Sequence, residues 1–423
     1  MTTDTQKDYL LAPYRILDLT GENGLMCGKM LGDLGADVVI VEPPGGHPAR
    51  GIGPFYKDEV HPEKSLFWFA FNTSKKGITL DLTRPEGQKL VKELVRQADI
   101  VIESFAPGYL DALGLGYTAL SAIKPDVIFT SITPFGQKGP RRDWKGTDLT
   151  LHARSGFQYL LGDPDRAPVR ISVPTIAVKA GVEAATATLF ALFHRNTNGE
   201  GQQVDVSTQA CGVWQLMNAT SFPKHHGVNQ ARAGDRYNAG FGNARAILPC
   251  ADGYVTFFTA GGHMGAPTLY AISRWMDSEG KLPDFMRGQQ WEKWDLAKLA
   301  TDPTARQEMD DINEAIGLFL ATKSKWEIWE RAFKERMLAA PVNNIQDIVE
   351  HPQPNARGFF HALPYPELNT EIRYPGHWAL MSNAQAGPRF RAPHLGEHNE
   401  EIYCQRLGYS KEQLADWQHK GVV

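Results

Sequence analysis

The sequence predicts an α/β protein whose larger part is a doubly wound, mostly parallel β-sheet, followed by a smaller α+β domain. Short runs rich in Val and Ile alternate with segments of helical spacing, and turns containing glycine or proline separate them. This alternation stops near Pro223, where His, Gly, Arg and Asn become frequent. Strands that alternate with helices pair in parallel through right-handed crossovers, so the first part should form an open sheet with helices on both faces.

The first strand–helix–strand unit is predicted within residues 14–41. Residues 14–20 form a β-rich run that ends in glycines, 25–34 have helical spacing, and 38–41 form a second buried strand. The same alternation continues along the chain. It predicts strands at 78–82, 100–102 and 127–132, and helices at 85–97, 110–113 and 117–123.

A helix rich in alanine and leucine is predicted at residues 181–193. Its residues are small or apolar with a single charge, Glu183, which is typical of a helix buried on most sides. Turn residues follow at 196–201, and a strand is predicted at 204–207. The segment before the helix, 173–180, is where an active-site group would lie at a helix N-terminus.

Ligands of doubly wound sheets bind at the carboxyl ends of the strands. Four loops follow predicted strands there: 21–24, 42–46, 103–108 and 134–148. The first is rich in glycine, but its spacing is not GxGxxG. Phosphate binding by backbone N–H groups and a turn that needs glycine for tight packing therefore both remain open.

The second part of the chain is less regular. Residues 224–243 are typical of a long crossing loop, and 246–258 contain two strand-like runs around a turn. Residues 291–334 are helical and charged. From Pro341 the chain is rich in proline, and a small helix at 411–418 closes it.

Composition excludes several classes of partner. The net charge of −4 gives no reason to expect nucleic acid or an anionic membrane. There is no apolar run of 18 residues and no signal-peptide pattern at the start, so we expect a soluble cytoplasmic protein. No metal site is expected, because the cysteines are far apart and lack metal-ligand spacing: they are Cys27, Cys211, Cys250 and Cys404.

Several segments together resemble the class III CoA-transferases, the family of formyl-CoA transferase and carnitine CoA-transferase. Each segment is weakly specific, but the series occurs in the same order over nearly the whole chain. The matching segments are RILDLT at 15–20, LGDLGAD at 31–37, VEPPGG at 41–46, the stretch 71–82, ESFAPG at 103–108, GEGQQVD at 199–205, APHLGEH at 392–398 and the closing residues 407–423.

The resemblance implies a Rossmann-like large domain from 1–222, a linker and small domain from 223–340, and a C-terminal return to the large domain from 341–423. It also implies an obligate dimer of two interlocked chains. The family moves CoA between carboxylates through an aspartyl anhydride and an aspartyl-CoA thioester. CoA and its thioesters would be substrates, with no permanently bound cofactor.

Some loop residues match the CoA-contacting positions of the family. They are Glu22, Asn23, Asn72, Lys75, Lys76, Ser104 and Phe105. Lys75 and Lys76 have a separate argument, because adjacent cations beside a strand would suit CoA phosphates; the alternative is a solvated pair at a strand start. Pro43 and Ala112 depart from the family, since formyl-CoA transferase has arginine at both positions.

The family's nucleophilic aspartate is replaced. It precedes by four residues a glycine that opens the buried helix, here Gly181, and Ala177 occupies that position. The residues on either side, 175–179, contain no carboxylate. Asp148 is the nearest other candidate, although an N-capping or structural role is expected for it. The α-methylacyl-CoA racemase branch fits no better, since Thr147 and Ala177 replace its acid/base pair.

A glycine-rich loop of the small domain covers the reacting centre in this family. Residues 258–265, FTAGGHMG, resemble that loop in a diminished form. The alternative is an ordinary turn between a strand and a helix.

Three functions follow from these residues. The first is a subunit of a heteromeric CoA-transferase, such as the benzylsuccinate CoA-transferase of anaerobic toluene degradation, with succinyl-CoA as donor and an aromatic or dicarboxylic acid as acceptor. A paralogous partner chain would then supply the aspartate. The second is an active homodimer that uses Asp148 or another carboxylate. The third is an acyl-CoA-binding protein without catalysis.

Overall fold

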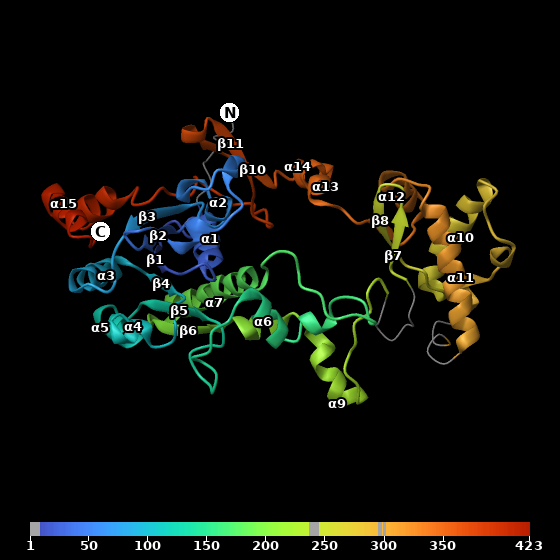
Figure 1. Cartoon of the computed structure of the whole chain (residues 1–423), viewed down its shortest axis with the longest axis horizontal. Coiled ribbons are helices and arrows are strands. Elements are labelled where there is room, and N and C mark those ends of the chain that lie inside the picture. The colour runs from blue at the N-terminus through green and yellow to red at the C-terminus, as the bar shows by residue number, and fades with distance from the viewer. Residues whose placement is uncertain (1–8, 237–244, 295–297, 299–301) are drawn as a thin grey trace. The chain divides into compact units, whose positions relative to one another are not determined.

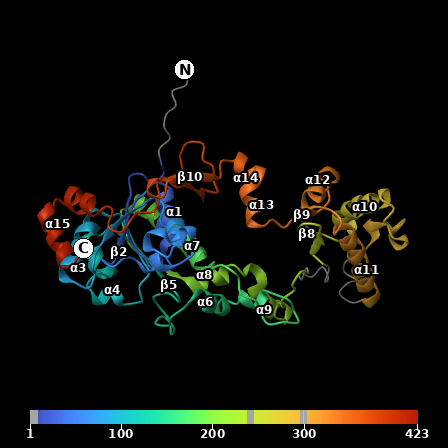
Figure 2. The same ribbon diagram turned by 45° about the horizontal axis from the view of Figure 1, so that its top comes forward.

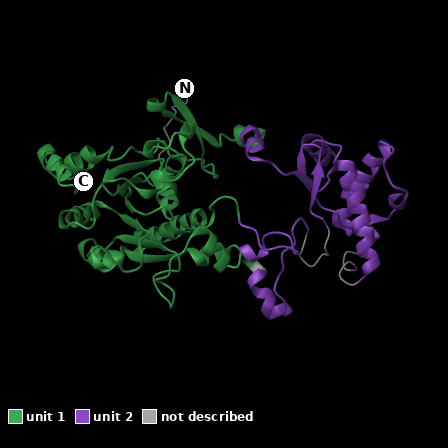
Figure 3. Ribbon diagram, in the orientation of Figure 1, with its two compact units in different colours: residues 1–157, 171–217, 352–423 green, residues 158–170, 218–351 purple. Residues whose placement is uncertain are grey.

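The computed structural model describes residues 9–236, 245–294, 298 and 302–423. These residues form two compact units, which Figure 3 colours separately. Unit 1 consists of Met1–Phe157, Ile171–Met217 and Pro352–Val423, and unit 2 consists of Gln158–Arg170 and Asn218–His351. The chain therefore passes between the units several times.

Unit 1 is built on a six-stranded parallel sheet, as the alternating sequence predicted (Figure 1). Its spatial order is β3-β2-β1-β4-β5-β6, so the order reverses between β1 and β4. The strands are β1 (Arg15–Leu19), β2 (Asp37–Glu42), β3 (Lys75–Thr79), β4 (Ile100–Glu103), β5 (Ile128–Thr133) and β6 (Gln202–Ser207).

Helices cover both faces of this sheet, because alternate strand residues point to opposite sides. Leu17 and Val39 pack on one face with helix α3, whereas Ile16 and Val38 pack on the other with α1 and α7. The helices of unit 1 are α1 (Leu25–Asp33), α2 (Leu66–Phe71), α3 (Pro85–Gln97), α4 (Tyr109–Ala112), α5 (Tyr117–Ile123), α6 (Asp148–Arg154), α7 (Ile176–Asn198), α8 (Thr208–Trp214), α14 (Pro352–Ala356) and α15 (Lys411–His419).

The C-terminal segment completes the core on the α3 face. Its hairpin of β10 (Phe360–Tyr365) and β11 (Thr370–Pro375) packs in a separate cluster with α2, whereas the π-helical turn Glu400–Arg406 that follows packs on the α3 face. Tyr403 donates a hydrogen bond to the Thr79 carbonyl at 2.8 Å, and Tyr409 donates one to Glu93 at 2.7 Å. Figures 1 and 2 both show α15 beside α3. The core of the N-terminal sheet thus depends on the end of the chain.

Unit 2 is α+β, as predicted. Its antiparallel sheet has the order β7-β8-β9, and α10, α11 and α12 contribute to its core together with that sheet. The elements are β7 (Ile247–Cys250), β8 (Gly253–Phe257), β9 (Ala339–Pro341), α9 (Phe222–His226), α10 (Gly262–Ser278), α11 (Pro303–Leu320), α12 (Lys325–Glu335) and α13 (Ile345–Glu350). Part of the predicted crossing loop, residues 237–244, lies outside the described residues.

Two predicted boundaries were wrong. Strand β3 runs over Lys75–Thr79 rather than 78–82, because its pairing with β2 begins at Val38 and the chain turns away after Thr79. Helix α7 begins at Ile176 rather than 181, so the segment 173–180 before the predicted helix already contains the first helical turn.

Within the described residues, α7 is the one helix long and apolar enough to cross a membrane by length and composition. In the structure it packs against α1 and the β5–β6 side of the sheet, and its small residues Ala180, Ala184 and Ala185 belong to the buried core. Such a core helix satisfies the same test of length and composition without spanning a membrane.

Candidate functional site

The loops after β1 and β4 meet where the strand order reverses. The Gly21 N–H donates a hydrogen bond to Ser104 Oγ at 2.7 Å, which joins the two loops across this switch point. In open α/β sheets the crevice at the carboxyl ends beside such a switch point is the usual ligand site. The predicted loops 21–24 and 103–108 are therefore brought together.

A pocket of about 300 Å³ lies at this carboxyl edge, and we call it the carboxyl-edge pocket. Strands β1 to β4 or the loops that follow them all contribute to its wall. Its lining residues are Leu19, Val41, Pro43, Pro44, Leu80, Asp81, Leu82, Thr83, Phe105 and Tyr109. The size and the largely apolar lining suit the body of a small organic ligand.

The pocket has an aromatic wall and a polar corner. The rings of Phe105 and Tyr109 are stacked, with centroids 4.9 Å apart and planes 26° from parallel. At the corner Asp81 accepts hydrogen bonds from the Thr83 N–H at 2.9 Å and hydroxyl at 2.6 Å, which lower the pKa of Asp81. Arg84 lies beside it, 3.3 Å from Asp81. The aromatic wall would be complementary to a flat aromatic group.

Four predicted residues lie in the two loops joined at the switch point. Phe105 lines the pocket itself, and Ser104 holds the loops together. Glu22 is exposed and Asn23 is half-buried in the turn before α1. All four residues therefore belong to the loops at the carboxyl edge of the sheet.

The other three predicted residues lie elsewhere. Asn72 is buried and donates a hydrogen bond to the Trp68 carbonyl at 3.1 Å. Lys76 pairs with Asp37 at 3.2 Å and Glu401 at 2.7 Å, and Asp37 is the first residue of β2. Lys76 therefore lies toward the amino ends of the strands, away from the pocket edge.

The proposed contact of Lys75 with a phosphate does not fit its environment. Lys75 is 0% exposed, and its ammonium lies 2.9 Å from Asp18 and donates to the Leu25 carbonyl at 2.8 Å. Burial lowers the pKa of Lys75, and the adjacent Asp18 opposes that shift. The solvated-pair alternative is equally wrong for Lys75, whose role is an internal ion pair between β1 and β3.

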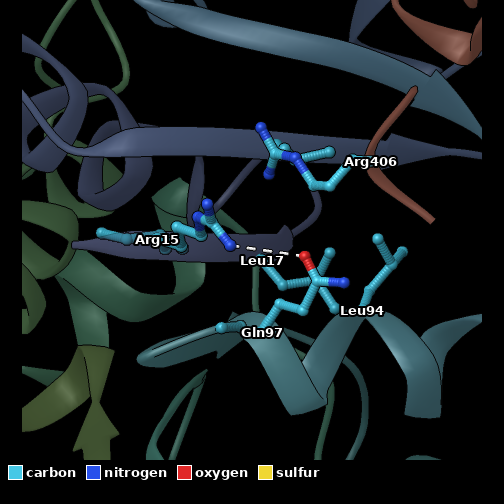
Figure 4. A pocket seen from close by; sticks show the side chains of 8 residues that line it. Arg15, Leu17, Leu94, Gln97 and Arg406 are labelled. Carbon is cyan, nitrogen blue, oxygen red and sulfur yellow. Dashed lines mark hydrogen bonds between the residues drawn. The ribbon is translucent and has the colours of Figure 1, made fainter. Parts of the chain in front are cut away.

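A second, very small cavity lies toward the amino ends of the strands (Figure 4). Arg15, Gln97 and Arg406 are among its lining residues, and Arg15 donates a hydrogen bond to Gln97 at 3.3 Å. Its volume of about 20 Å³ is close to the space of one water molecule, too small for a substrate. Within the described part of the chain no cluster of His, Cys, Asp or Glu could hold a metal ion.

Ala177 lies in the first turn of α7 and is half-buried. Asp148 caps this helix, because its Oδ1 accepts hydrogen bonds from the N–H groups of Thr175 at 2.9 Å and Ile176 at 3.1 Å. His152 is buried beside the cap, with Nε2 2.9 Å from the Thr175 hydroxyl. These contacts favour the capping role of Asp148, since its carboxylate neutralises the orphan donors of the helix start.

Glu183 is the carboxylate on α7 itself. It forms an ion pair with Lys179, one turn earlier on the same side of α7. At 100° per residue, Glu183 lies about 120° around the helix from Ala177. The carboxylate therefore points away from the position that Ala177 occupies.

The glycine-rich segment 258–265 forms the turn between β8 and α10 and the first turn of α10 in unit 2. A Cβ atom at Gly261 would meet the backbone of Trp294, and one at Gly265 would meet the carbonyl of Ala260. Tight packing therefore requires glycine at these two positions.

Sequence reasoning missed the pocket residues from Leu80 to Thr83. The predicted strand 78–82 includes Leu80, Asp81 and Leu82, whereas β3 ends at Thr79 and these residues form the loop after it. The signal was present in Thr83-Arg84-Pro85, because a proline at the first helical position marks a loop that leads into a helix.

The strand order is that of a doubly wound α/β protein, and the pocket lies beside the switch point, where ligands of such sheets usually bind. The profile of CoA-transferase family III matches residues 11–399, and the chain belongs to that family of enzymes.

Three curated relatives cover nearly the whole chain. It is 32% identical to the succinyl-CoA:(R)-benzylsuccinate CoA-transferase subunit BbsE of Thauera aromatica, over 97% of each chain. It is 33% identical to the succinyl-CoA–D-citramalate CoA-transferase of Chloroflexus aurantiacus, over 95% of this chain and 94% of the relative. It is 29% identical to the succinyl-CoA–L-malate CoA-transferase beta subunit of the same organism, over 98% of each.

A solved structure of a CAIB/BAIF family protein from Brucella suis has the same fold. Its TM-score is 0.80 at 27% identity, and the match covers 95% of this chain and 100% of that one.

Proposed function

We propose that this chain is a subunit of a class III CoA-transferase that takes CoA from succinyl-CoA to an aromatic or dicarboxylic acid. In this proposal the chain binds CoA in the carboxyl-edge pocket, and a paralogous partner chain supplies the nucleophilic aspartate. The assignment of CoA binding to this chain and of the nucleophile to its partner rests on one observation. Ala177 lies at the start of α7, where the family places that aspartate.

The pocket supports the CoA part of the proposal. The stacked pair Phe105–Tyr109 and the aliphatic residues around it offer a surface for an adenine ring. The guanidinium of Arg84 lies next to the lining residue Thr83 and is half-exposed, so a phosphate of CoA could reach it. Succinyl-CoA is named in the three curated relatives described above.

The local chemistry of α7 supports the absence of a covalent intermediate on this chain. An alanine methyl group can neither attack a thioester nor leave from an anhydride. The nearest carboxylates are engaged, since Asp148 caps the helix and Glu183 pairs with Lys179 on another face. The homodimer that uses Asp148 as nucleophile is the weaker candidate, because one oxygen of that carboxylate caps α7 and the other is buried.

Exposed apolar residues support a partner chain. Phe190 and Phe193 are 70% and 76% exposed on one side of α7, and Trp214 of α8 is 74% exposed. Large apolar groups exposed on a surface are typical of protein interfaces. Two of the curated relatives are themselves named as subunits. An interlocked hetero-oligomer would cover these side chains.

The thiols support a cytoplasmic location. All of the cysteines, which lie in the described part of the chain, are free. Unpaired thiols are usual in the reducing cytoplasm.

Ala177 also favours a second candidate, an acyl-CoA-binding protein without any catalysis. Purification from the source organism separates the two. A stoichiometric paralogous chain and transferase activity in the purified material support the subunit, whereas a lone chain that binds CoA without turnover supports the binding protein.

Calorimetric titration with CoA tests the pocket. Phe105→Ala should weaken CoA binding by roughly tenfold or more, because stacking of a base on an aromatic ring contributes about 1–3 kcal/mol. Phe135→Ala is the matched control, since this half-buried ring packs against Trp144 and does not line the pocket. Equal affinities of both variants and the parent chain would place CoA elsewhere.

A further inference from the structure

A polar cavity of about 310 Å³ lies on the other side of β4 from the carboxyl-edge pocket, and we call it the Glu103 cavity. It is formed by the end of β4, by α4 and α5, and by the loop that follows β5. The charged residues of its lining are Glu103, Asp111, Lys138 and Arg142, and its uncharged polar residues are Tyr117, Thr118, Ser131, Gln137 and Gln203. The transferase chemistry described above uses none of these side chains.

Among the lining residues the charges are segregated by element, although Arg142 also lies 3.3 Å from Asp143 of its own loop, which does not line the cavity. Glu103 at the end of β4 and Asp111 on α4 supply carboxylates, while Lys138 and Arg142 on the loop after β5 supply cations. Glu103 is 4% exposed, and the two cations are exposed. Within the described residues, Glu103 has no ion-pair partner, although its Oε2 accepts a hydrogen bond from the Phe105 N–H at 2.7 Å.

A cation that enters the cavity would stabilise the ionised form of the Glu103 carboxyl group. Burial raises the pKa of Glu103 to about 7, and the nearby carboxylates Asp111 and Asp205 add to the rise. The Ser131 hydroxyl and the Phe105 N–H oppose it. The ionised form of Glu103 therefore lacks the opposite charge that a buried carboxylate usually has.

We propose that the Glu103 cavity binds a small zwitterion of the amino-acid type. Its ammonium group faces Glu103 and Asp111, and its carboxylate faces Lys138 and Arg142. A dicarboxylate would bring a negative charge to Glu103 and Asp111, and a diamine would bring a positive charge to Lys138 and Arg142. Only a ligand that carries both a positive and a negative charge is complementary to the carboxylates and to the cations of the cavity. The cavity volume suits a small molecule of the amino-acid type.

The proposal predicts a direction for the effect of pH. The ammonium group pairs with ionised Glu103, so affinity should rise as the pH passes from below to above 7. Between pH 6 and pH 8 the dissociation constant should fall about tenfold. With a pKa of about 7, the ionised fraction of Glu103 rises about tenfold over that range. The ligand's own amine and carboxylate keep their charges across this range.

Titration calorimetry of the full chain with ω-amino acids of three to six carbons tests the site, with succinate and 1,4-diaminobutane as ligands of a single sign. We expect saturable binding of at least one ω-amino acid, tighter at pH 8 than at pH 6. Glu103→Gln and Arg142→Gln should each weaken it about tenfold or more, the loss of one charge-assisted contact. Arg141→Gln is the matched control, because Arg141 is a neighbouring exposed cation of the same loop that does not line the cavity.

The proposal is overturned if no ω-amino acid of the series binds the parent chain. It is also overturned if Glu103→Gln and Arg142→Gln bind the zwitterion as tightly as Arg141→Gln does. Succinate binding that strengthens toward pH 6 and disappears in Glu103→Gln would assign the cavity to dicarboxylates instead. Should Glu103→Gln fail to fold, Arg142→Gln on the exposed loop decides alone. All of these binding measurements are made without CoA and without an assay of transferase activity.

Discussion

Individual residues of the same type have unlike roles in this protein. Lys75 and Lys76 are adjacent, yet Lys75 is buried against Asp18 while Lys76 reaches the acidic residues Asp37 and Glu401 near the surface. The alternation of side chains along β3 sends the two ammonium groups to opposite faces of the sheet. Substitutions at these positions should therefore have different consequences.

Lys75→Ala should lower the free energy of unfolding by about 3–5 kcal/mol, because it leaves the Asp18 carboxylate buried without its partner. The double variant Asp18→Asn, Lys75→Met should recover much of this loss, since it removes both charges together. Denaturant unfolding at neutral pH measures the free energy of unfolding of the single and the double variant. A stable Lys75→Ala protein whose CoA affinity becomes insensitive to salt would instead assign Lys75 to a phosphate.

Ala177→Asp should create a chain that becomes acylated by succinyl-CoA, detectable as a mass increase of the intact protein. The new carboxylate would lie in the first turn of α7, where the helix N-terminus stabilises negative charge. Val178→Asp is the control, because it adds the same charge to the same turn about 100° further around the helix. An adduct on the parent chain itself would contradict the lost-nucleophile proposal.

At the scale of elements, the start of α7 is determined by a residue from another helix. Asp148, in the first turn of α6, accepts hydrogen bonds from two N–H groups at the α7 start. The N-cap residue of α7, Thr175, makes no capping hydrogen bond with its own side chain. The two helix N-termini are thereby held together next to Ala177.

Asp148→Ala should destabilise the protein by about 1–2 kcal/mol through loss of this cap. Asp148→Asn should lose less, because its amide oxygen can still accept from the helix N–H groups. Thermal and denaturant unfolding of both variants give the comparison. If Asp148→Asn kept full stability but abolished turnover of the assembled enzyme, a chemical role for Asp148 would replace the capping role.

At the scale of the whole molecule, the exposed rings of α7 and α8 are the feature that a monomer leaves unexplained. We expect a hetero-oligomer with a paralogous chain in the source organism, and a homodimer when this chain is expressed alone. Native mass spectrometry of both preparations measures the composition. Phe193→Glu should weaken the assembly, because a charge would replace an apolar ring at the contact, whereas Val60→Glu, also at an exposed apolar side chain, should not. A homodimer with full transferase activity from the source organism would contradict both the assembly and the role of Ala177.

The sequence by itself determined the parallel α/β fold, the family and the alanine at position 177. These depend on the period of apolar residues and on residue identity, both of which are local. It also located most of the loops at the carboxyl edge, including the segments that contain Ser104, Phe105 and Glu103.

Only the tertiary structure decided which side chains those loops present, and to what. The burial of Lys75 depends on Asp18 in another strand, the start of α7 on Asp148 in another helix, and the position of Leu80 at the pocket on where the pairing of β2 and β3 ends. The same holds for Glu103, whose carboxyl group is desolvated by residues from β5, α4 and α5. Each is a contact between segments that are distant in the chain, and the free energy of burying a charge or capping a helix is set by those contacts rather than by the neighbouring sequence.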